Sequence, residues 1–166
     1  MVLRSFYRLV VSFALCYGVG CAGALYALPM VASWFSGLKK PDFTPPAESF
    51  IPIGMFCYFL MALSLYFLWS EDPDKKDTKT AIEFFLFGLL LNFAWIYVFF
   101  GLQSPFLGLI VMIMLIAIVL STIYQSMRVS IAAAVLLVPY FIGCIAAIII
   151  NYYIFIMNPA LPIFLL

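Results

Sequence analysis

Long stretches that contain no charged residue alternate with short polar segments along this chain. Charged residues are absent between positions 9 and 38, from 50 to 70, from 84 to 127, and after Arg128. A helix needs about 20 consecutive apolar residues to cross the hydrocarbon core of a bilayer. The pattern therefore predicts several membrane-spanning helices.

Five spans fit this pattern. An α-helix satisfies its own backbone hydrogen bonds in lipid, so we expect helices rather than open strands. We predict an all-α integral membrane bundle, one domain with transmembrane helices over residues 9–32, 50–69, 82–101, 105–125 and 130–157. The last two connections are very short, so the helices that they join must be antiparallel neighbours.

The two longer connections differ in character. Loop 1, over residues 33–49, contains Pro41, Pro45 and Pro46 and is flanked by aromatic residues. Such loops are typically ordered lids or binding loops. Loop 2, over residues 70–81, is a polar segment that keeps two helix ends in water.

The distribution of basic residues predicts the orientation of the bundle. Lys39 and Lys40 are the basic residues of loop 1, whereas the N-terminus and the second and fourth loops carry Arg4, Arg8, Lys75, Lys76, Lys79 and Arg128. Cytoplasmic loops of membrane proteins are enriched in Lys and Arg. We therefore expect the N-terminus to face the cytoplasm, with loop 1 on the opposite side.

Composition excludes several classes of protein. The chain has 166 residues, of which 67% are hydrophobic, 19% aromatic and only 9% charged, and its net charge is +1. A water-soluble domain needs more polar surface, and a nucleic-acid-binding protein needs a basic patch. The chain has no His, and its four Cys form no CxxC pair, so neither a metal site nor a redox motif is supported.

Two amides lie at membrane depth and are the main candidates for polar chemistry. Asn92 lies three residues before Trp95, so both share one helix face. For Asn92, ligand contact and hydrogen bonding between helices are both open. Asn151 is flanked by aliphatic and Tyr residues, and for it we favour hydrogen bonding between helices. Without His and with few carboxylates, no pair of nucleophile and base can be assembled.

Three blocks of sequence resemble the TspO/MBR family, the tryptophan-rich sensory proteins and translocator proteins. The first is WFSGLKKPDFTPP at 34–46, which resembles the family pattern W-Y-x-x-L-x-K-P-x-W-x-P-P. The second is NFAW at 92–95 followed by FFG at 99–101. The third is RVS at 128–130, LVPY at 137–140 and Asn151-Tyr152. The blocks keep the family's order and cover nearly the whole chain.

The resemblance implies a homodimeric five-helix bundle with a ligand pocket beneath loop 1. Members of the family bind tetrapyrroles such as protoporphyrin IX, and some bind sterols or drugs. Because this chain lacks His, a metal-free porphyrin is the expected ligand, and no cofactor is required. Lys39 and Lys40 lie at the mouth, where they are candidates to meet propionates. Carried over by position, the ligand-binding residues are Pro45, Pro46, Phe50, Asn92, Trp95, Tyr140 and Ala147.

The chain departs from the family at four positions. Gly54 and Gly143 replace Trp residues of the second and fifth helices, Phe43 replaces the Trp of loop 1, and Val111 replaces an acidic residue. Some bacterial members are proposed to degrade porphyrin by using such indoles. Their loss lowers the expectation of that activity and leaves a pocket that is either larger or refilled by neighbours such as Phe56.

We therefore expect a membrane protein that binds a tetrapyrrole or another apolar ligand for sensing, sequestration or transport. A binding protein is favoured over an enzyme. The alternatives are a porphyrin-degrading enzyme and an assembly partner of other membrane proteins that has lost the pocket. A bacterial inner membrane is favoured over the outer mitochondrial membrane as the location.

Overall fold

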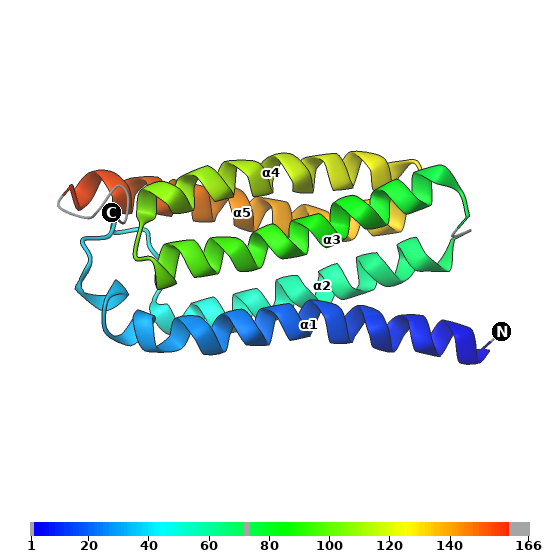
Figure 1. The fold of residues 1–166 in the computed structure, drawn as a ribbon, viewed down its shortest axis with the longest axis horizontal. Helices are drawn as coiled ribbons and strands as arrows, with labels where there is room; N and C mark the ends of the chain where they lie inside the picture. The colour runs from blue at the N-terminus through cyan, green and yellow to red at the C-terminus, as the bar shows by residue number, and fades with distance from the viewer. Residues whose placement is uncertain (1, 72–73, 160–166) are drawn as a thin grey trace.

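Five long helices form the molecule, as a computed structural model shows (Figure 1). The structure describes residues 2–71 and 74–159. The long helices are α1 (Val2–Ala32), α2 (Phe50–Ser70), α3 (Lys76–Ile96), α4 (Pro105–Met127) and α5 (Ile131–Met157). Each is long and apolar enough to cross a membrane, which confirms the predicted fold class. Helices hide their backbone polar groups from lipid, so this is the form that such sequences must take.

The helices form a closed ring around the centre of the bundle. The most extensive contacts pair α4 with α5, α3 with α4, α1 with α2, and α2 with α5, and α3 closes the ring by contacting α1 and α2. Loop 1 and the end of α5 lie at one end of the bundle, opposite the N-terminus (Figure 1).

Two helices begin earlier than the spans expected from hydropathy. α1 begins at Val2 instead of position 9, and α3 begins at Lys76 instead of position 82. The polar turn of α3 is helical because one side of it packs inward: Thr78 and Ala81 are buried, while Lys79 is exposed. Charged side chains therefore indicate where a helix leaves the membrane. They do not indicate where its backbone hydrogen bonding begins or ends.

The connection between α3 and α4 contains a π-helical turn, η3 (Tyr97–Gly101). The Leu102 amide donates to the Tyr97 carbonyl, and two residues after the turn ends, Gln103 has a φ of 52°. α4 then begins with Pro105 after Ser104, whose side chain accepts a hydrogen bond from the Leu107 amide. Pro at the first helical position and Ser at the cap are typical of a helix start.

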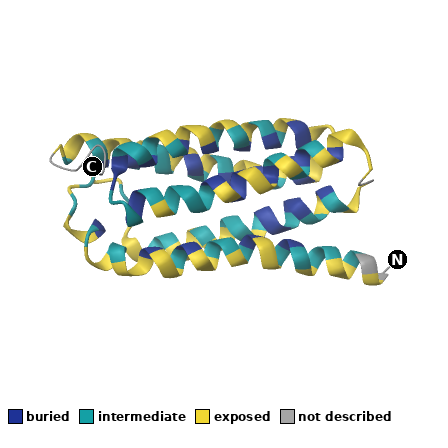
Figure 2. Cartoon of the chain, in the orientation of Figure 1, coloured by how far each residue is buried: buried dark blue, intermediate teal, exposed yellow. Residues whose placement is uncertain are grey.

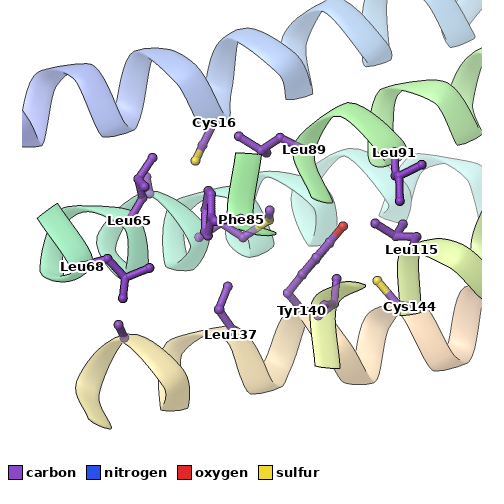
Figure 3. Close-up of a cluster of buried hydrophobic side chains, with 14 of the residues drawn as sticks. Cys16, Leu65, Leu68, Phe85, Leu89, Leu91, Leu115, Leu137, Tyr140 and Cys144 are labelled. Carbon is purple, nitrogen blue, oxygen red and sulfur yellow. The ribbon is translucent and has the colours of Figure 1, made fainter. Parts of the chain in front are cut away.

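The interior divides into an aliphatic half and an aromatic half. From the middle of the bundle to the loop 2 end, the core is built mainly from aliphatic side chains; Figure 3 shows Leu65, Leu68 and Leu137 on one side of this cluster and Leu115 beside Leu91 and Cys144 on the other. At the loop 1 end, the buried side chains are Ala27, Phe35, Phe99, Phe100 and Ile154. Trp95 packs against both clusters and so joins the two halves.

The outward face of the bundle is apolar. Figure 2 shows exposed positions along the outer side of each helix, and they include Leu90, Ile113 and Ile142. In a water-soluble protein, such extensive apolar exposure would drive aggregation. In a bilayer it is the surface that contacts lipid.

Gly20 allows α1 and α2 to approach closely, because a Cβ at this position would lie 2.6 Å from the Tyr58 ring. We expect Gly20→Val to lower the free energy of unfolding by about 1–3 kcal/mol, the usual cost of overpacking. Gly18→Val is the matched control, since a Cβ at Gly18 meets no atom within 4 Å. Thermal unfolding in detergent measures both variants, and equal melting temperatures would contradict the prediction.

Candidate functional site

A chain of hydrogen bonds joins three helices near the middle of the bundle. The Tyr58 hydroxyl of α2 donates to Oδ1 of Asn92 on α3. Nδ2 of Asn92 donates in turn to the Tyr140 hydroxyl of α5, at 2.8 Å. Figure 3 shows Tyr140 pointing from α5 into the centre of the bundle. Asn92 therefore uses both ends of its amide between helices, and we call these three residues the polar bridge.

The polar bridge gives these three side chains the hydrogen-bond partners that lipid cannot supply. Tyr140 is 7% exposed, and Tyr58 and Asn92 are half-buried. A polar group without a partner costs several kcal/mol in a hydrocarbon environment. Cys16 of α1 and Cys144 of α5 also point into this region (Figure 3), and both thiols are free. Among the described residues, no three His, Cys, Asp or Glu side chains gather to hold a metal ion.

An aromatic cluster lies one turn further toward loop 1. Trp95 stacks on Phe99 with ring centroids 5.3 Å apart and planes at 22°. Phe99 and Phe100 meet edge to face at 4.9 Å. The π-helical turn carries both Phe rings inward, where they are 2% and 9% exposed. Turns of this kind occur frequently at functional sites.

Trp95 has an unsatisfied donor. Its Nε1 atom is buried and has no hydrogen-bond partner among the residues that the structure describes. Buried polar groups in native proteins are normally paired, so an orphaned indole N–H is an available contact for a ligand. Because it lies among aromatic rings, it offers one hydrogen bond within an apolar surface.

Loop 1 forms a half-open cavity of about 280 Å³ against the end of α1. Its walls are mainly apolar or Pro residues, with a few polar side chains; they include Val31, Phe35, Lys40, Thr44, Pro45 and Pro46. The Thr44 hydroxyl is buried and, within the described ranges, makes no hydrogen bond. The cavity thus combines apolar walls with a small number of polar groups, as ligand sites usually do.

The end of α5 holds loop 1 in place. The Asn158 side chain accepts a hydrogen bond from the Lys39 amide at 3.1 Å and donates to the Lys39 carbonyl at 2.9 Å. It also donates to the Ile154 carbonyl, which fixes its position on α5. Beside this clamp, Phe43 meets Tyr153 edge to face at 5.4 Å.

The predicted ligand-binding residues fall into three groups. Pro45 and Pro46 line the cavity. Asn92 and Tyr140 bond to each other in the polar bridge. The remaining residues are packed side chains: Trp95 on Phe99, Phe50 edge to face with Phe35 at 6.0 Å, and Ala147 against the aliphatic core. The groups extend from loop 1 to the middle of the bundle, with Phe35 and Phe99 packed between the cavity and Trp95.

Asn151 bonds between helices, which confirms the reading favoured for it. Its Nδ2 atom donates to the Pro105 carbonyl at the start of α4, at 3.2 Å. The residue is 1% exposed and lies beside Gly108, where a Cβ would come within 3.1 Å of its amide. Asn151 thereby fixes the start of α4 against α5.

The two glycines that replace family Trp residues leave room along α2 and α5. A Cβ at Gly54 would meet no atom within 4 Å, and one at Gly143 would meet only the Cys57 sulfur, at 3.9 Å. Phe56 is 59% exposed and does not refill this space. Val111 is half-buried and packs against the aliphatic core.

Several residues of the site were missed in the sequence. Phe35 was seen only as part of the loop 1 motif, and Asn158 lies just after the last span, where one amide looks like an ordinary boundary residue. The signal for Asn158 was its place at the end of a helix, where Asn commonly caps. Its partner in loop 1, 119 residues away, had no signal in the sequence.

Replacing Asn92 should destabilise the bundle more than removing one hydroxyl. We expect Asn92→Leu to cost about 1–2 kcal/mol, because two buried hydroxyls lose their partner, and Tyr58→Phe to cost about 0.6 kcal/mol. Unfolding in mixed detergent measures both. Equal losses would show that the bond to Tyr140 contributes nothing.

Replacing Asn158 should release loop 1. We expect Asn158→Ala to speed hydrogen exchange of the Lys39 amide by about three- to tenfold, the effect of one lost hydrogen bond. Asn158→Asp keeps the acceptor for that amide and is expected to retain most of the protection. Mass spectrometry of the loop 1 peptide makes the comparison; unchanged exchange in the Ala variant would rule out the clamp.

Comparison with known proteins supplies the family. The model of the TspO/MBR family matches residues 12–157. The tryptophan-rich protein TspO of Archaeoglobus fulgidus is 36% identical over 152 residues, which cover 91% of this chain and 97% of the relative. TspO of Chlorobaculum tepidum is 33% identical over 157 residues, or 94% of this chain and 99% of the relative. The translocator protein of Sus scrofa is 29% identical over 120 residues, 72% of this chain and 71% of the relative. With a family match along nearly all of its length and five spanning helices, the chain belongs to the TspO/MBR family.

Proposed function

We propose that this protein binds a metal-free tetrapyrrole of the protoporphyrin type, or another flat apolar ligand, without covalent chemistry. The ligand would lie in the aromatic half of the bundle, beneath loop 1. Binding there would serve sensing, sequestration or transport. Membership of the TspO/MBR family supports this proposal together with the chemistry of the site.

The buried indole N–H of Trp95 is the observation that carries the proposal. It is an unused donor within a wall of aromatic rings. A planar apolar ring gains stacking energy on such a wall, and one polar contact fixes its orientation. The pyrrole nitrogens and carboxylates of a porphyrin supply acceptors of the required kind.

Space for a large ring is the second requirement. A Cβ at Gly54 or Gly143 would meet no close neighbour, and loop 1 forms a half-open cavity. Phe99 and Phe100 pack against Phe35, which lines the cavity, so a ligand that continues from the cavity toward Trp95 requires these aromatic side chains to move. Movement of loops and side chains upon binding is common where the site is closed in the free protein.

The proposal stops at binding. The family members proposed to degrade porphyrin use indoles at the positions of Gly54 and Gly143, and this chain has no side chain there. Illumination of the bound complex tests the point: we expect the porphyrin to bleach no faster than it does without protein.

Titration of the purified protein with protoporphyrin IX tests the proposal. We expect a saturable shift of the porphyrin absorption band and quenching of Trp fluorescence. Trp95→Phe keeps an aromatic ring and removes the N–H, so the affinity should fall about two- to tenfold, the value of one neutral hydrogen bond.

Trp69→Phe is the matched control. Its indole N–H is also buried and unpartnered within the described residues, but it lies at the loop 2 end of the bundle. The affinity of the Trp69→Phe variant for protoporphyrin IX should equal that of the wild type. Absence of any band shift in the wild type would overturn the proposed function, and equal effects of both Trp variants would move the ligand away from Trp95.

A further inference from the structure

Phe35 separates the loop 1 cavity from the interior of the bundle. Its side chain lines the cavity, yet the residue is only 5% exposed. The ring meets Phe50, Phe99 and Phe100 at centroid distances between 5.8 and 6.3 Å. A ligand in the cavity therefore reaches the aromatic cluster only if this ring moves.

The cavity is too small to be the whole site. Pockets for drug-sized ligands usually measure about 300–1,000 Å³, and this cavity measures about 280 Å³. It has room for part of a macrocycle or for a small aromatic molecule. A larger ligand would use it as an entrance and continue past Phe35.

Lys40 holds Phe35 in its closed position through two kinds of contact. The Lys40 ammonium lies 4.7 Å from the centroid of the Phe35 ring, within the range of a cation–π interaction. The same ammonium donates to the Phe35 carbonyl at 2.7 Å, and to the carbonyls of Leu38 at 3.1 Å and Ser36 at 3.3 Å. The side chain thus folds back over the turn that carries Phe35.

Within the described residues, the groups that contact this ammonium are neutral. Its three hydrogen-bond partners are backbone carbonyls, and the fourth contact is an aromatic ring. Hydrogen bonds between an ammonium and a carboxylate are about twice as strong as neutral ones. Asp42 also lines the cavity, but it is exposed, where water screens its charge. A carboxylate brought into the half-buried cavity would compete for the ammonium.

We propose that Phe35 is a gate between the loop 1 cavity and the aromatic interior, and that Lys40 is the latch which a ligand carboxylate releases. The inference rests on the proposed function and narrows its ligand to an apolar molecule with at least one carboxylate. The ligand carboxylate draws the Lys40 ammonium away from the turn that carries Phe35. The Phe35 ring is then able to move, and the apolar part of the ligand passes into the interior of the bundle. The unpartnered Thr44 hydroxyl offers the carboxylate a second donor.

Stopped-flow binding of protoporphyrin IX and of its dimethyl ester tests the latch. In the wild type, we expect the diacid to associate about fivefold faster than the ester, the equivalent of one half-exposed charge pair. In Lys40→Met the apolar stem remains and the ammonium is lost, so the ester should speed up and the difference should disappear. Lys75→Met is the matched control, because it removes an exposed lysine charge at the loop 2 end, far from loop 1, and it should keep the difference.

A second pair of variants tests the gate itself. Phe35→Leu shortens the ring that blocks passage and keeps an apolar side chain in the core. It should speed association of the ester, and adding Lys40→Met should bring no further gain. Additive effects of the two substitutions would overturn the coupling between gate and latch.

Hydrogen exchange without ligand gives a readout that is independent of binding. In the closed turn, the Gly37 amide donates to the Trp34 carbonyl and the Leu38 amide to the Phe35 carbonyl. Both amides should exchange severalfold faster in Lys40→Met than in Lys75→Met. Unchanged exchange, or equal rates for acid and ester in wild type, overturns the latch and leaves the proposed function standing. If the wild type binds neither protoporphyrin IX nor its dimethyl ester, the proposed function is overturned. The release of the Lys40 latch by a ligand carboxylate is then overturned as well.

Discussion

The bilayer offers no water, so a polar group inside this bundle costs free energy unless the protein supplies its hydrogen-bond partner. The polar bridge of Tyr58, Asn92 and Tyr140 is the clearest consequence, since one amide satisfies two hydroxyls from different helices. The two hydrogen bonds of the bridge fix the positions of α2, α3 and α5 relative to one another along the bundle axis. The axial positions of these helices in turn place the residues between the polar bridge and loop 1, including those of the candidate site.

The division of the core follows from this arrangement. Aliphatic side chains fill most of the half toward loop 2, where the leucines pack closely against one another. Aromatic rings fill the half beneath loop 1, where flat surfaces and one unused indole N–H face one another. The composition of the core thus changes along the bundle axis, and the proposed ligand site lies in the aromatic half.

The sequence was sufficient for the fold because the signal for a membrane span is long and local. Runs without charge placed all five helices, although the polar first turns of α3 were missed, since charged side chains are compatible with helix outside the bilayer. The family resemblance added the candidate residues.

The contacts among those residues could not be foreseen in the same way. That Asn92 meets Tyr140, or that Phe35 lies between the cavity and Phe99, depends on how far each helix is rotated and raised against its neighbours. Hydrophobic periodicity predicts which residues share one face of a helix, but it does not predict which residues of a neighbouring helix that face contacts. The clamp between Asn158 and Lys39 joins segments at opposite ends of the chain, and neither segment carries a local pattern that names the other.

The same clamp has a consequence for biogenesis. Helices enter the membrane in the order of synthesis, so loop 1 leaves the ribosome long before Asn158 does. Until the final helix is inserted, Lys39 has no anchor and Phe43 has no Tyr153 to rest on. The contacts that hold loop 1 over the bundle can therefore form only after α5 has been synthesised.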